Sequence, residues 1–136
     1  MAKLVTNQYT ITVNGDDFSD HLAAIEFSIS VDEQETTAFG SGYRSRIGSL
    51  KDASVTLSWH QDFGAASVDA KLYPLLGSFA TVVAKPTSGS VTATNPSYTG
   101  VFLVSSYTPI NGAVGDLATF DTTWNLASGS VVRGTA

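Results

Sequence analysis

Several stretches of this chain alternate apolar and polar residues with a period of two, and this alternation restricts the possible folds more than any other feature. The clearest stretch is residues 53–60, ASVTLSWH, in which every second residue is apolar. Successive side chains of a strand point to opposite faces of its sheet, so the pattern is typical of a strand with one buried and one solvent-facing side. The chain is therefore expected to form antiparallel sheet.

Five further segments have a strand pattern: residues 9–13, 25–31, 79–85, 98–107 and 119–126. One short helix is expected at about residues 67–73, because Ser67 is a suitable N-cap and Pro74 and Gly77 follow as stop signals. These elements predict a mainly β fold, a β sandwich or split barrel of about six or more antiparallel strands with one short flanking helix.

Residues 32–51, DEQETTAFGSGYRSRIGSLK, interrupt this order. They lack the strand period and contain too much Gly and Ser for a helix, which indicates a long loop. Connections longer than about 12–15 residues are uncommon unless they are functional or disordered. We therefore expect this segment to be a projecting arm with a role outside its own domain.

Length and charge limit the function. A chain of 136 residues fits a single domain spanning residues 1–136, with residues 127–136 as a Gly- and Ser-containing tail that is expected either to be mobile or to dock on a neighbour. Its net charge of −5 argues against binding driven by neutralisation of nucleic-acid phosphates or of an anionic membrane surface. The absence of cysteine excludes disulfides and thiolate metal sites. The N-terminal sequence predicts neither a signal peptide nor a membrane span.

Catalytic, cofactor and metal motifs are not recognised. His21 and His60 lie in different elements, and a two-histidine metal site has far less support than an ordinary structural role for both. The acidic residues at 16, 17 and 20 lack calcium-loop spacing and are better explained by turn formation. We expect no catalytic residue, no cofactor and no metal, and we do not expect an enzyme.

The charges of residues 32–51 are separated along the segment: acidic residues come first and basic residues last, with apolar residues between or beside them. One interpretation is a surface hairpin whose two limbs pair with each other. The other is an arm that docks on an adjacent copy through aromatic and arginine side chains, which are enriched at interface hot spots. The candidate interface residues are Asp32, Glu33, Glu35, Phe39, Gly40, Gly42, Tyr43, Arg44, Arg46, Ile47 and Lys51.

The order of parts along the chain resembles the tail tube, or major tail, proteins of long-tailed bacteriophages. The resemblance is carried by VNGDDFSDHLAAIEFSIS, TTAFGSGYRSRIGSLKDASVTLSW, VDAKLYPLLG, KPTSGSVTATNPSYTG and GDLATFDTTW, which span nearly the whole sequence. It implies a structural protein of the virion, made in the bacterial host cytoplasm, that self-assembles into stacked hexameric rings forming a conduit for DNA. It also implies contacts with other tail proteins, such as tape measure and terminator proteins, with DNA only as passing cargo.

Two other classes stay open. A virion decoration or carbohydrate-binding β-sandwich module would share the composition, with Trp59, Tyr73, Tyr98 and Trp124 as candidate sugar platforms, although their apolar-face positions favour core packing. A ligand-binding barrel of the lipocalin type is weaker, because six strands are fewer than the usual closed eight.

Overall fold

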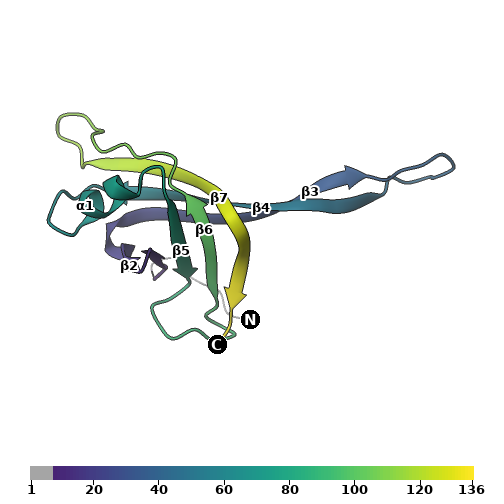
Figure 1. The fold of residues 1–136 in the computed structure, drawn as a ribbon, viewed down its shortest axis with the longest axis horizontal. Coiled ribbons are helices and arrows are strands. Elements are labelled where there is room, and N and C mark those ends of the chain that lie inside the picture. Colours follow the sequence, from purple (N-terminus) through teal and green to yellow (C-terminus); the bar gives the residue numbers. More distant parts are fainter. Residues whose placement is uncertain (1–7) are drawn as a thin grey trace.

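Seven strands make one antiparallel sheet in the computed structural model, which describes residues 8–136 (Figure 1). The strand order is β2-β1-β5-β6-β7-β4-β3. In chain order the elements are β1 (Thr10–Val13), β2 (Asp16–Asp17), the 3-10 turn η1 (Ser19–His21), β3 (Leu22–Glu35), β4 (Arg46–His60), α1 (Val68–Leu72), the 3-10 turn η2 (Tyr73–Leu75), β5 (Phe79–Lys85), β6 (Ser97–Leu103) and β7 (Thr119–Gly134). The predicted mainly β fold with one short α-helix is confirmed.

Strand β7 joins the two halves of the sheet. Its first part pairs with β4, from His60 opposite Thr119 to Ser54 opposite Asn125. Its second part pairs with β6 through an irregular register, and Gly129 there has a positive φ of 70°. Such irregularities bend a strand and increase its twist, and β7 is visibly curved in Figure 1. The sheet thereby folds over, with β3 and β4 in one layer and β1, β5 and β6 in the other.

The core lies between these layers and is rich in aromatic side chains. Trp59 of β4 packs on Phe18 and Phe120, with ring centroids 5.4 and 5.9 Å away. Phe27 of β3 meets Phe102 of β6 edge to face at 5.5 Å, which links the layers directly. Residues Ala53, Val55, Leu57 and Trp59 are all buried, as the alternation of residues 53–60 predicted.

The sheet does not close into a barrel. In residues 8–136, β1 and β3 do not pair with each other, and an open groove of about 370 Å³ lies between them. Tyr9 and Ile11 line one side of the groove and Leu22 and Ile25 the other. The arrangement is therefore sandwich-like, with β3 as an exposed edge.

The helix and the first turn follow the sequence signals closely. Asn14 and Gly15 both have positive φ, 52° and 86°, as a two-residue hairpin turn requires. This turn also creates β2, a two-residue strand too short to be recognised from periodicity. Helix α1 begins after Ser67 and buries Val68 and Leu72, which fixes it against the core. No helix of residues 8–136 is long and apolar enough to cross a membrane.

Residues 32–51 are not the loop that the sequence predicted. β3 continues to Glu35 and β4 begins at Arg46, so only residues 36–45 lie outside the strands. The physical reason is exposure: every residue from 28 to 52 is exposed. The period of two arises when one face of a strand is buried, and a strand exposed on both faces has no reason to show it.

Two other segments also differ from expectation. Residues 127–134, predicted as a tail, belong to β7, where Thr99 pairs with Val132 and Ser97 with Gly134. Conversely, the strand expected over residues 98–107 ends at Leu103. A connection without strand or helix then runs over residues 104–118, because Val104 bonds to Ser78 outside the ladder and Pro109 follows.

Candidate assembly interface

The antiparallel hairpin of residues 32–51, called the arm below, projects away from the body of the molecule (Figure 1). β4 pairs with β7 only from Ser54 onward, so among residues 8–136 only β3 is paired with β4 in the arm. The pairs nearest the tip are Gln34 with Ile47 and Glu35 with Arg46. The arm is thus a two-stranded ribbon without a core of its own, a structure that is only marginally stable by itself.

Local hydrogen bonds shape the tip. The Thr36 N–H donates to the Ser45 carbonyl at 2.8 Å, and the Ser45 N–H donates to Thr37 Oγ1 at 2.9 Å. Gly40 has a φ of 89°, in the left-handed region that favours glycine, and supplies the sharp turn. The tip therefore has a defined conformation rather than being a shapeless extension of the two strands.

The separated charges pair across the hairpin. Arg44 Nη1 lies 3.6 Å from Glu35 Oε1, and Arg46 Nε lies 3.6 Å from Glu33 Oε2. All four side chains are at least half exposed, so each pair contributes only about 0–1 kcal/mol. The interpretation of two limbs that pair with each other is confirmed. This pairing does not account for the apolar side chains of the same segment.

Those apolar side chains are almost completely exposed. Phe39 and Tyr43 at the tip are 110% and 91% exposed, and Leu50 and Ile47 on β4 are 75% and 60% exposed. An aromatic side chain removes about 150–250 Å² of surface from water when it is buried. Burial of Phe39 and Tyr43 would therefore be strongly favourable, but no part of residues 8–136 buries them. Clustered exposed apolar groups of this kind mark interaction sites.

All predicted arm residues lie on this hairpin. Asp32, Glu33 and Glu35 are on β3, Arg46, Ile47 and Lys51 are on β4, and Phe39, Gly40, Gly42, Tyr43 and Arg44 form the tip. Sequence reasoning missed Ile29, Val31 and Leu50, which are also exposed. The first two continue the apolar face of β3 beyond the point where the opposite layer covers it, so their period indicated a core position. Leu50 has no periodic signal.

The loops of residues 61–67 and 104–118 lie at the opposite end of the molecule from the arm (Figure 1), and they carry a second group of exposed apolar side chains. We call it the end patch; it consists of Phe63, Ile110, Val114 and Leu117. A shallow hollow of about 250 Å³ lies beside these residues, lined by Phe63, Pro109, Ile110, Asn111, Gly112, Ala113, Asp116 and Ala118. Sequence reasoning missed this surface because turn residues separate its members and give them no period.

The outward face of β3, β4 and the first part of β7 is polar, and it carries no lysine or arginine where all three strands pair. Cross-strand neighbours on this face are Glu26 beside Thr56 and Thr56 beside Thr123, with Asp121 one row further along. Thr56 Oγ1 and Thr123 Oγ1 are hydrogen-bonded at 3.2 Å. The face is therefore uncharged to acidic.

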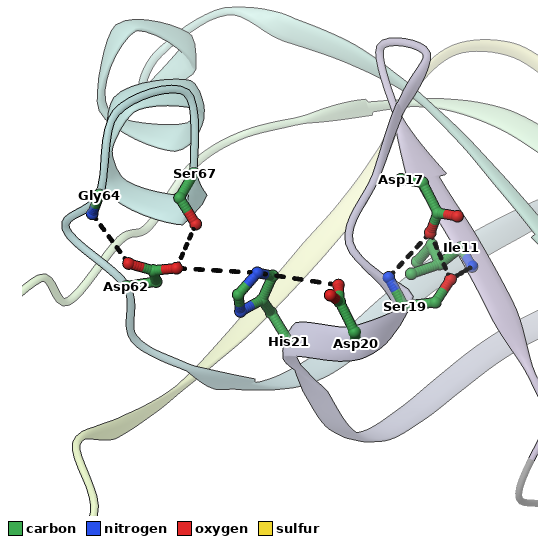
Figure 2. A network of polar contacts seen from close by, with 8 residues as sticks. All are labelled: Ile11, Asp17, Ser19, Asp20, His21, Asp62, Gly64 and Ser67. Carbon is green, nitrogen blue, oxygen red and sulfur yellow. Dashed lines mark hydrogen bonds and ion pairs between the residues drawn. The ribbon is translucent and has the colours of Figure 1, made fainter.

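A polar cluster connects η1 to the start of α1 (Figure 2). His21 Nε2 lies 3.8 Å from Asp62 Oδ2 and 3.7 Å from Asp20 Oδ1. Hydrogen bonds from Ser67 Oγ and from the Gly64 N–H, together with the nearby His21, hold the pKa of Asp62 below its usual value. Ser67 thus uses its hydroxyl on Asp62 rather than on the backbone of α1.

A second set of hydrogen bonds connects η1 to β1 (Figure 2). Asp17 Oδ1 accepts hydrogen bonds from the N–H and the hydroxyl of Ser19, which lower the pKa of Asp17. Ser19 Oγ in turn accepts the Ile11 N–H at 3.0 Å. Asp17 therefore has the turn-forming role predicted for the acidic residues of this segment.

The remaining candidate sites are not assembled in residues 8–136. No group of three or more His, Asp or Glu side chains is arranged there to hold a metal ion. His60 ends β4 with a buried Nδ1 that has no hydrogen-bond partner among these residues. Trp59 and Trp124 are fully buried, so the proposed sugar platform of four aromatic side chains is wrong for these two.

The fold of this chain is similar to the folds of chains in gene transfer agent particles. No protein-family model and no curated protein matches the sequence. A chain in the virion of a native gene transfer agent particle superposes with a TM-score of 0.76 over 98% of this chain and 100% of that one, at 16% identity. This chain shares the fold of that virion protein.

A second match comes from the tail of an empty gene transfer agent particle with C6 symmetry. Its TM-score is 0.66 over 85% of this chain and 83% of the other, at 17% identity. The resemblance to tail proteins seen in the sequence is thereby confirmed at the level of the fold.

Proposed function

We propose that this protein is a tail tube protein of a phage-like particle, which self-assembles into hexameric rings that stack into a hollow tube for the passage of DNA. It is made in the host cytoplasm, resides in the virion tail and has a structural, non-enzymatic role. Its partners are further copies of itself and the proteins that contact the tube, such as tape measure and terminator proteins.

One observation carries this proposal: the chain superposes over nearly its full length on a protein of an assembled gene transfer agent virion. The second match, to a tail with C6 symmetry, supports six copies per ring. Because these identities are 16% and 17%, the argument rests on fold rather than on shared residues. The features of this chain that suit assembly therefore need to be considered separately.

The arm is the first of these features. Its exposed apolar and arginine side chains are of the types enriched at interface hot spots, and they lie far from the core. A contact between the arm and a different surface of the next copy is heterologous, and heterologous contacts produce rings or filaments rather than closed dimers.

The polar outward face of β3, β4 and β7 is the second feature. In a tube, one face of the sheet must line the channel, and a wall that binds phosphates would hold the DNA in place. We assign this face to the channel, because in the region where β3, β4 and β7 all pair it carries Glu26 and Asp121 but no lysine or arginine. An uncharged to acidic wall allows a polyanion to slide past it.

Electron microscopy of the purified protein tests the proposal. At high concentration the wild-type chain is expected to form six-fold rings and tubes in negative stain, with a central channel. A discrete small oligomer without a channel would instead indicate a decoration module, and a monomer at every concentration would contradict assembly altogether.

A further inference from the structure

We propose that the arm of one copy docks on the end patch of a second copy, with Phe39 and Tyr43 covering the hollow beside Ile110, and that this contact joins successive rings. The inference rests on the proposed tube function and adds the receiving surface of the arm. It begins from the placement of two exposed apolar surfaces at opposite ends of one elongated molecule (Figure 1).

The end patch is exposed to a degree that matches the arm tip. Ile110 and Val114 are 87% and 106% exposed, compared with 91% for Tyr43. Within residues 8–136 neither surface is covered by another part of the chain. The two exposed apolar surfaces can bury each other only in an assembly, because their positions at opposite ends exclude a contact within one copy.

The receiving loop is held in place before any partner arrives. Gln61 donates through Nε2 to the Pro109 carbonyl at 2.8 Å and to Tyr107 Oη at 3.1 Å. Tyr107 in turn donates to Asp69 Oδ1 at 2.6 Å. Burial of the phenol, followed by its bond to Asp69, raises the pKa of Tyr107 to about 12, so this anchor stays protonated at neutral pH. A preorganised surface loses little conformational entropy on binding.

Charge also matches between the two surfaces. Residues 36–46 of the arm contain two arginines and no acid, whereas residues 104–118 contain Asp116 and no base. Asp116 lines the hollow, and in residues 8–136 it forms no ion pair within the chain. An approaching Arg44 exchanges its exposed, weak pair with Glu35 for a pair that is partly shielded from water by the surrounding apolar groups.

The size of the hollow suits a side chain rather than a ligand. Its volume of about 250 Å³ is below the ~300–1,000 Å³ typical of small-molecule pockets. A contact between opposite ends is heterologous, and a heterologous contact that does not close into a ring repeats along a filament, as the stacking of rings requires. The arm and the end patch are therefore the two halves of one repeating contact.

Two variants, each of which lacks one side of the proposed contact and is called half-blocked, provide the test. In the arm-shortened variant, Asn-Gly replaces residues 31–51, so that Ser30 and Asp52, which are directly paired, are joined by a two-residue hairpin turn. In the patch variant, I110S, V114S and L117S remove exposed apolar groups without touching the core. V132S, which removes a side chain of 59% exposure elsewhere, is the matched control.

Each half-blocked variant alone is expected to form rings but no tubes, and V132S is expected to form tubes like the wild type. A mixture of the two variants retains one intact arm and one intact patch, so it should give paired rings that grow no further. If the patch variant formed normal tubes while the arm-shortened variant did not, the end patch would be the wrong receiver although the tube function stood. If the wild type formed neither rings nor tubes, both proposals would fail.

Cysteine cross-linking gives an independent readout, because the natural chain contains no cysteine. In the Y43C/V114C double variant, a short bismaleimide should link copies into a ladder of covalent oligomers in a denaturing gel. Y43C/S90C, with the second thiol on the exposed 86–96 connection, should give no ladder. Equal ladders from both variants, or none from the first in assembled tubes, would overturn the inference.

Discussion

The two halves of β4 belong to one continuous strand and pair with the same neighbour, yet they have opposite surroundings. Residues 53–60 alternate between buried and half-buried positions, whereas residues 46–52 are exposed on both faces. Backbone pairing with β3 is present in both halves, so the difference lies in what the side chains contact. Residues 53–60 stabilise the fold of one copy, whereas residues 46–52 carry side chains that remain exposed in the single copy.

Substitution of large apolar side chains is expected to give the largest difference in the free energy of unfolding between residues 53–60 and residues 46–52. W59A removes a fully buried indole that contacts Phe18, Phe120 and Trp124 and should lower the free energy of unfolding by about 3–5 kcal/mol. I47S in the arm should change it by no more than about 0.5 kcal/mol, because this side chain is already 60% exposed. Urea unfolding of both variants at a concentration below assembly measures this contrast. Equal losses would show that the arm contributes to the stability of the single copy.

A smaller effect is expected from a buried polar group. Trp59 Nε1 donates to Thr122 Oγ1 at 2.9 Å inside the core. T122V keeps the shape of the side chain but leaves the indole N–H without an acceptor, which should cost about 1–3 kcal/mol. T123V, on the exposed face of the same strand, is the matched control and should cost about 0.5 kcal/mol or less. Similar losses in the two variants would contradict a special role for the buried bond.

The smallest effect is expected from the ion pairs of the arm. E33Q removes the partner of Arg46 and should lower the stability of the monomer by about 0–1 kcal/mol, an effect that decreases with added salt. E26Q, on the exposed face of β3 outside the arm, is the control. A loss of several kcal/mol for E33Q would mean that the arm is stabilised by its own charges and not by docking.

Local patterns predicted the strands wherever one face is buried. The alternation of residues 53–60 identified the core side of β4, and Asn14-Gly15 identified the first hairpin turn, because burial and positive φ each restrict which residues are tolerated. The same reasoning placed α1 within a residue of its start.

No strand periodicity is visible in the sequence where burial of one face does not restrict the residue types. Residues 32–35 and 46–51 are strand without a buried face, so nothing in them repeats. Residues 127–134 are strand in an irregular register opposite β6, which conceals any period. The end patch combines residues from two segments that are distant from each other in sequence. Gln61 connects them by donating to the Pro109 carbonyl and to Tyr107 Oη, and only the folded structure brings the two segments together.

Residues 86–96 illustrate the same difficulty on a smaller scale. Their Ser, Thr and Pro content indicates a flexible connection, yet Asn95 is buried and bonds to the backbone at three positions within the loop, Thr87, Gly89 and Ser90. One asparagine side chain thereby organises the connection. Composition reports the average polarity of such a segment but not the single residue that orders it.

The arm-shortened variant in electron microscopy tests the central claim most directly. If the arm acts between copies, the variant should keep the wild-type midpoint of urea unfolding, within the error of the measurement, because all of the removed residues are exposed in the single copy. It should form no tubes at concentrations at which the wild type forms them. Tubes of normal length and diameter from the folded variant would contradict the claim.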